Sequence, residues 1–174
     1  MPTTEKLLKH MAWSNTEILS WVATLPDDAL DAYVVNPEWT VREIIQHYVR
    51  SAHFYGFRLQ LTTPKEASEE KAKRDLYRHN QQELKVSSDI LNLVELLKKA
   101  DQVLFEESLM DEGFVYREVD GKLIERARST IIFQAVHHAT EHRAQFVSAL
   151  EARGYSSLSL DDYDLWAYAD KFGE

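Results

Sequence analysis

One segment of the sequence holds two histidines at the spacing of a helical metal site, in the run HHATEHRAQ at residues 137–145. His138 and His142 are four residues apart, so on a helix their side chains lie one turn apart on the same face. Counted at about 100° per residue from Ile131, both lie within about 20° of the apolar seam of this segment. Two imidazoles in this arrangement can bind one divalent metal ion. The alternative is a pair of core histidines, and it is less favoured because two buried imidazoles leave several polar atoms to satisfy.

A metal site needs at least one more protein ligand, and residues 41–59 offer two further histidines. His47 and His53 both lie away from the centre of the apolar stripe of that segment. Periodicity alone therefore favours His47 only slightly.

Other polar side chains lie on or near these apolar faces. Asn15 falls in the middle of the apolar sector of the N-terminal segment, where an amide needs a partner such as a ligand histidine, a substrate or another helix. Glu141 lies at the rim of the histidine seam, where a solvated carboxylate is favoured over a base near the metal. Arg143 points about 120° away from that seam, which favours a surface or interhelical salt bridge. The remaining histidines are expected to be exposed: His10, His79 and His137.

Amphipathic segments must position these residues. Apolar periodicity and end signals predict four long helices, from Thr3 or Thr4 to Pro26, from Thr40 to Pro64, from Ser88 to Met110 and from Ser129 to Gly154. Thr40 and Glu43 predict a capping box at the start of the second helix. A last short helix is expected around residues 161–171.

The connections complete the predicted fold. The alternating sequence FVYREVDGKLIER predicts a β-hairpin with a type I′ turn at Asp120-Gly121. The charged stretch 65–85 predicts a long connection, either without regular structure or with a short solvated helix. We therefore expect one all-α domain over residues 1–174, an antiparallel four-helix bundle with a long crossover between helices 2 and 3 and a small hairpin before helix 4.

Composition excludes several classes of function. The chain has 29 acidic and 20 basic side chains for a formal charge of −9, so we expect neither nucleic acid nor a membrane as a partner. It has no cysteine, which excludes disulfides, thiolate metal sites and a cysteine nucleophile. Its five glycines cannot form a GxGxxG or Walker loop. The sequence lacks a membrane-spanning apolar run and an export signal, so we expect a cytoplasmic protein.

Four stretches, in order over most of the chain, carry a family resemblance. They are HMAWSNTEIL, WTVREIIQHYVRSAHFY, HHATEHRAQ and LEARGYSSLSLDDYDLWAY. The first holds Trp13 and Asn15, and the second holds a Trp-Thr cap before His47. Together they resemble the DinB/YfiT-like superfamily of four-helix metalloproteins.

The third stretch resembles the superfamily's His-x3-His-Arg-x-Gln pattern, through His138, His142, Arg143 and Gln145. The sequence departs at Ala144, where many relatives have glycine; a small residue is kept, so we expect only minor repacking.

The resemblance implies a site in which His47, His138 and His142 hold a divalent metal ion at one end of the bundle. Three neutral nitrogen ligands leave one or more open positions on the ion, as in catalytic sites. The ligand type fits Zn²⁺, Ni²⁺, Fe²⁺ or Mn²⁺.

An open site favours an enzyme with a small-molecule substrate. Bound water would give a hydroxide for hydrolysis, and a bound thiol would give a thiolate that attacks an electrophilic carbon. The thiol would be a low-molecular-weight cofactor, and transferases that use bacillithiol or mycothiol are known in the superfamily that the chain resembles. We expect a metal-dependent thiol S-transferase or hydrolase that acts on a small electrophile in stress or detoxification. Asn15 and Gln145 would orient ligands or substrate, and Glu141 or Tyr48 would handle protons.

The alternative is a non-catalytic, dimeric stress or binding protein whose metal is structural or absent. Trp13 and Trp21 lie off the centre of the first helix's apolar stripe. They indicate a homodimer surface or, alternatively, a wide buried face in a monomer.

Overall fold

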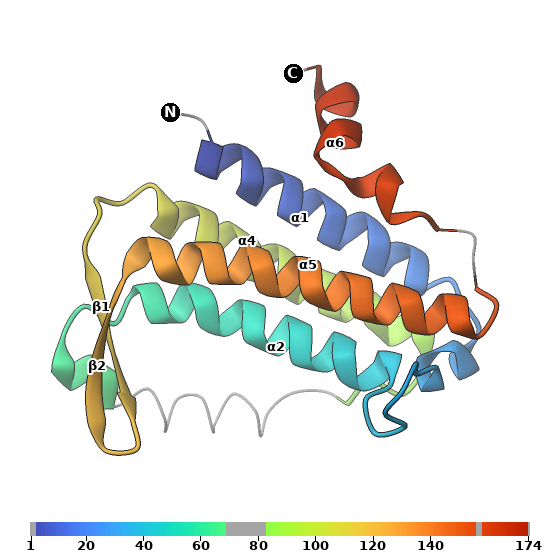
Figure 1. Cartoon of the computed structure of the whole chain (residues 1–174), viewed down its shortest axis with the longest axis horizontal. Coiled ribbons are helices and arrows are strands. Elements are labelled where there is room, and N and C mark those ends of the chain that lie inside the picture. The colour runs from blue at the N-terminus through green and yellow to red at the C-terminus, as the bar shows by residue number, and fades with distance from the viewer. Residues whose placement is uncertain (1–2, 69–82, 156–157, 174) are drawn as a thin grey trace.

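Four long helices form the body of the molecule in a computed structural model, which describes residues 3–68, 83–155 and 158–173 (Figure 1). They are α1 (Thr3–Val22), α2 (Val41–Leu59), α4 (Ile90–Ser108) and α5 (Arg128–Ala152). Helix α1 packs on α4 and α5, and α2 packs on the same two helices. The predicted all-α four-helix bundle is confirmed.

The chain direction explains the long crossover. Helices α1 and α5 run one way along the bundle, whereas α2 and α4 run the other way (Figure 1). Because α2 and α4 are parallel neighbours, the chain must return along the length of the bundle between them. Most of the predicted connection at 65–85 lies outside the described residues, as does His79.

The helix ends follow the sequence signals. The Thr40 hydroxyl accepts a hydrogen bond from the Glu43 backbone N–H at 3.4 Å, at the start of α2. At the end of α5, Gly154 has a φ of 93°, which favours glycine. The Tyr155 N–H then donates to the Leu150 carbonyl and closes the helix end.

The predicted hairpin is confirmed. Strands β1 (Phe114–Val119) and β2 (Lys122–Ala127) are antiparallel, with Val119 opposite Lys122. Asp120 and Gly121 form the turn with φ values of 50° and 73°, as a type I′ turn requires. The Tyr116 N–H donates to the Leu61 carbonyl at 2.9 Å, which fastens the hairpin to the end of α2.

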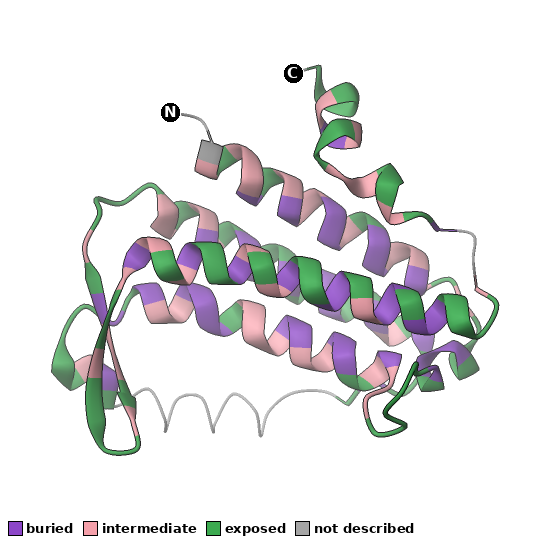
Figure 2. Cartoon of the chain, viewed as in Figure 1, coloured by how far each residue is buried: buried purple, intermediate pink, exposed green. Residues whose placement is uncertain are grey.

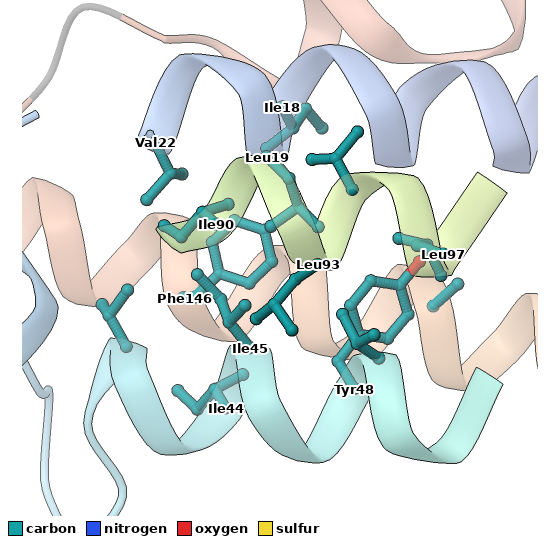
Figure 3. Close-up of a cluster of buried hydrophobic side chains, with 14 of the residues drawn as sticks. Ile18, Leu19, Val22, Ile44, Ile45, Tyr48, Ile90, Leu93, Leu97 and Phe146 are labelled. Carbon is teal, nitrogen blue, oxygen red and sulfur yellow. The ribbon is translucent and has the colours of Figure 1, made fainter. Parts of the chain in front are cut away.

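The core lies along the axis of the bundle. Buried residues face inward on every long helix, and exposed residues face out (Figure 2). Figure 3 shows apolar side chains of four helices meeting there, among them Ile18, Leu19, Val22, Ile44, Ile45, Ile90, Leu93, Leu97 and Phe146. This contact is what holds α2 and α5 in register.

Helices α2 and α4 approach each other closely at Gly56. A Cβ atom there would lie 2.9 Å from Val103 Cγ1, so a side chain would have to displace its neighbour. The absence of a side chain at Gly56 therefore sets the spacing of this helix pair.

The C-terminal segment packs on α1. It contains a 3₁₀ turn, η3 (Leu160–Tyr163), and the short helix α6 (Leu165–Phe172). The expectation that His10 is exposed is wrong, because its Nε2 lies 2.8 Å from the Tyr163 carbonyl oxygen and its ring contacts Tyr168.

The two tryptophans of α1 make contacts within the chain. Trp13 contacts Tyr163, Tyr168 and Phe172, and Trp21 packs against the core. Both tryptophans are therefore half-buried by contacts within one chain.

A polar cluster interrupts the apolar core. Asn15 Nδ2 donates to Asp101 Oδ2 at 2.9 Å, and Arg143 Nη1 donates to Asn15 Oδ1 at 2.5 Å. All three side chains are buried and come from α1, α4 and α5. Of the two alternatives for Arg143, the surface position is wrong, since α5 buries a wider arc than the seam centred on Ile131, which is itself only half-buried. Phe146, one turn after Arg143 on α5, is fully buried. The interhelical alternative agrees with the bond of Arg143 to Asn15 and with the nearby charge of Asp101.

Burial raises the pKa of Asp101 to about 7, while its hydrogen bond from Asn15 and the charge of Arg143 act in the opposite direction. Between about pH 4 and 7 the folded protein therefore holds a proton that the unfolded chain releases. The unfolding free energy contributed by this group falls as the pH rises through that range.

None of the described helices has the length and hydropathy needed to span a membrane.

Replacing Asn15 tests the polar cluster. Asn15→Ala removes the hydrogen bonds that Asn15 makes to the buried Asp101 carboxyl and to the buried Arg143 guanidinium, which keeps its bond to the Thr140 hydroxyl. We expect it to lower the unfolding free energy by about 2–3 kcal/mol. Asn92→Ala, an exposed asparagine on α4, is the matched control and should change it by less than about 0.5 kcal/mol. Urea denaturation followed by circular dichroism measures both. Equal effects would contradict the assignment.

Asp101→Asn tests the raised pKa. The unfolding free energy of the wild type minus that of the variant should fall as the pH rises from about 4 to about 8, because only the wild type releases the proton. Urea denaturation at a series of pH values gives this difference. A constant or rising difference would show that the pKa of Asp101 is not raised in the fold.

Candidate metal centre

Three histidine side chains from two antiparallel helices converge on one point. His47 comes from α2, and His138 and His142 come from successive turns of α5. His138 Nε2 lies 3.1 Å from His47 Nε2 and 3.0 Å from His142 Nε2. One ligand atom from each of the three residues lies within 4.8 Å of the others. The structure thus brings together the residues that the sequence placed on separate helices. The expectation that the site lies at one end of the bundle is wrong, because these residues lie well inside α2 and at the middle of α5.

The spacing suits a shared cation. At metal–nitrogen distances of about 2.0–2.1 Å and tetrahedral angles, two ligand nitrogens are about 3.3 Å apart. The two separations from His138 Nε2, 3.1 and 3.0 Å, are close to that value. His47 and His138 are half-buried, and only His142 is buried, so one side of the cluster is accessible. The donor set therefore fits a divalent metal ion.

The tautomer of His142 is fixed by its neighbours. The Trp39 indole can only donate, and its Nε1 lies 3.3 Å from Gln145 Oε1. The Gln145 amide nitrogen lies 3.4 Å from Glu141 Oε1, which can only accept when ionised. Because both contacts orient the amide the same way, His142 Nδ1, 2.8 Å from Gln145 Oε1, must be the donor. His142 Nε2 then carries the lone pair that a metal requires.

Burial sets the charge of His138. Burial lowers its pKa to about 3, and electrostatic repulsion from His142 and His47 contributes smaller shifts in the same direction. The ring is therefore neutral at pH 7, which is the state that binds metal. Its Nδ1 is buried and hydrogen-bonds to none of the described residues, which leaves that nitrogen able to carry the ring proton.

Aromatic rings enclose the cluster. The Trp39 ring lies 5.4 Å from the His47 ring, and the Tyr48 ring packs 6.3 Å from the His138 ring. Beyond Trp39, an apolar cavity of about 390 Å³ is lined by Val34, Val35, Ile44 and Ala149. The centre therefore lies beside a space that could hold an apolar group.

The other predicted residues lie at different distances from the histidines. Asn15 hydrogen-bonds to Asp101 and Arg143 rather than to a ligand histidine. The Tyr48 hydroxyl is buried close to the same polar cluster, and burial raises its pKa. Glu141 is exposed at the rim, one turn before Gln145. His137 is exposed as predicted, and His53 is exposed away from the cluster.

The sequence reasoning missed two residues that matter here. Asp101 is a lone carboxylate on the apolar stripe that contains Leu97 and Leu104, and that position was a usable signal. Trp39 lies beside the predicted cap of α2, and its indole also fixes the Gln145 amide. No periodicity argument could have placed that indole, because it precedes the helix.

The chain belongs to the DinB family, whose model matches residues 1–171. A search of curated proteins and a search of solved structures found no match.

Replacing Gln145 tests its effect on the ligand tautomer. Gln145→Leu removes the acceptor of the His142 N–H, and we expect Zn²⁺ affinity to fall by about 10–100-fold with the fold intact. Gln102→Leu, an exposed glutamine on α4, is the control and should leave affinity unchanged. Competition with a chromophoric chelator measures both. Unchanged affinity in Gln145→Leu would contradict the assigned role.

Proposed function

We propose that this DinB-family protein is a divalent-metal-dependent enzyme that acts on a small electrophilic substrate, as a thiol-dependent S-transferase or, second, as a hydrolase. His47, His138 and His142 are the proposed ligands of Zn²⁺, Ni²⁺, Fe²⁺ or Mn²⁺. The observation that supports it is the convergence of three Nε2 atoms on an accessible side of the bundle.

The chain itself prepares the site in three ways. Burial keeps His138 neutral, so its nitrogen competes poorly for protons. Gln145 holds the proton of His142 on Nδ1. The Trp39 ring excludes water from one side of the cluster.

When bound, the ion would lower the pKa of a coordinated thiol or water and so supply a nucleophile at neutral pH. A thiol would come from solution, since the chain has no cysteine. Glu141, at the rim, is the proposed proton acceptor, and Tyr48 serves by packing against His138 and His142. Asn15 supports the site indirectly, by holding Arg143 beside His142.

The thiol reaction is preferred over hydrolysis on one observation. Among the described residues, the three-histidine cluster contains no carboxylate, and Glu141 is exposed and hydrogen-bonded to Gln145. A water nucleophile needs a well-placed base more than a thiol does, because thiols have a much lower pKa.

Metal content tests the ligand set. Protein purified without a histidine-rich tag should hold about one ion per chain by mass spectrometry. His47→Ala, His138→Ala and His142→Ala should each lose it, whereas His137→Ala, an exposed neighbour on the same helix, should keep it. Zn²⁺ should raise the Tm of the wild type and of His137→Ala only, since a ligand of the folded state stabilises that state. Wild type without metal and without a Tm shift would favour a non-catalytic bundle.

The metal-loaded protein then distinguishes the two reactions. Thiols with a model electrophile should give metal-dependent product, whereas ester and amide substrates should not. Turnover of the esters alone would make hydrolysis the function.

A further inference from the structure

A second cavity lies next to the metal centre, on the side away from Trp39. It has a volume of about 350 Å³ and is formed by the end of α2, the hairpin and the start of α5. Tyr55 and Gln134 line it on the side of the histidines. The Tyr55 ring lies 5.5 Å from the His138 ring, so one aromatic side chain borders both the cavity and the proposed centre.

Three arginines line this cavity, each from a different element. Arg58 lies in the last turn of α2, Arg117 on β1 and Arg126 on β2. Strand geometry explains the two on the hairpin: Arg126 is paired with Val115, and Val115 and Arg117 are two residues apart, so all three share one face. The Arg58 guanidinium carbon lies 5.9 Å from the Tyr55 ring centre.

The described residues that line this cavity are basic, whereas the protein as a whole is acidic. The chain as a whole has a formal charge of −9, yet the residues lining the cavity in the described part of the chain include three guanidinium groups and no carboxylate. Glu125, the acidic neighbour of Arg126, is paired with Tyr116 and accepts a hydrogen bond from its hydroxyl at 3.2 Å. Guanidinium groups that line a partly enclosed cavity focus the electric field there and favour the binding of an oxyanion.

The distance to the histidines defines the size of the ligand. Thr130 and Gln134 line the cavity and lie two turns and one turn before His138 on α5. A helix rises by 1.5 Å per residue, so the cavity begins about 6 Å from His138 and extends to about 12 Å along the axis. A small molecule with an anionic group about 10 Å from its reactive atom would reach both.

We propose that this cavity is an anion subsite, in which Arg58, Arg117 and Arg126 bind the carboxylate or phosphate group of a small substrate or thiol cosubstrate. The inference rests on the proposed function only for the role of the ligand, since the oxyanion site itself needs no metal. It adds a substrate class: an anionic molecule that reaches the histidines past Tyr55.

Anion titration tests the subsite directly. Inorganic phosphate and succinate, titrated separately into metal-free wild-type protein and followed by amide chemical shifts, should bind with millimolar affinity and perturb residues of the hairpin and Gln134. Added NaCl should weaken the binding, because exposed ion pairs are screened. The two probes show whether phosphate or carboxylate is preferred.

Arginine variants complete the test. Arg58→Gln, Arg117→Gln and Arg126→Gln should each weaken anion binding, the half-buried Arg117 by about tenfold or more. Arg153→Gln, an exposed arginine beyond the far end of α5, is the control and should have no effect. Circular dichroism melting verifies that each variant folds; if Arg117→Gln does not, Arg117→Lys, which keeps the charge but loses the bidentate geometry, takes its place.

The two proposals fail separately. His138→Ala should lose metal and keep anion binding. No anion binding in the wild type, or equal binding in the arginine variants, overturns the subsite even if metal binds. If the wild type binds anions but takes up no metal ion when Zn²⁺ is added, the proposed function is overturned and the subsite stands.

Discussion

The packing of α2 against α5 is the contact on which the candidate site depends. His47 faces His138 and His142 only because apolar side chains along the bundle axis fix both helices in register. A shift of one residue along α2 would move its imidazole by about 1.5 Å and rotate it by about 100°. The geometry of the three nitrogens is thus a consequence of the core.

Sequence periodicity predicted the parts of the fold that burial alone decides. It gave the bundle, the hairpin turn and the pairing of His138 with His142, since each depends on spacing within one segment. His47 needed the family resemblance, because a half-buried ligand lies at the edge of an apolar stripe, where periodicity gives a weak signal. Periodicity left Arg143 between a surface and an interhelical position, because α5 contacts both α1 and α2 and no single seam describes the buried surface of α5.

The polar cluster behind the histidines shows why a buried position cannot be assigned from residue type. An arginine is normally exposed, and only an acceptor on another helix makes its burial tolerable. Asn15 supplies that acceptor to Arg143 and also donates to Asp101, so its amide links three helices. The three side chains are far apart in sequence, and their contacts appear only in the folded chain.

Gly56 has a consequence for ligand geometry. It sits about two and a half turns from His47 on the same helix, where it lets α2 lie close against α4 at Val103. A bulkier residue there would tilt α2 relative to α5 and change the distances between the three histidine nitrogens. A substitution at Gly56, which touches none of the three histidines, could therefore change the size of the ion that they prefer.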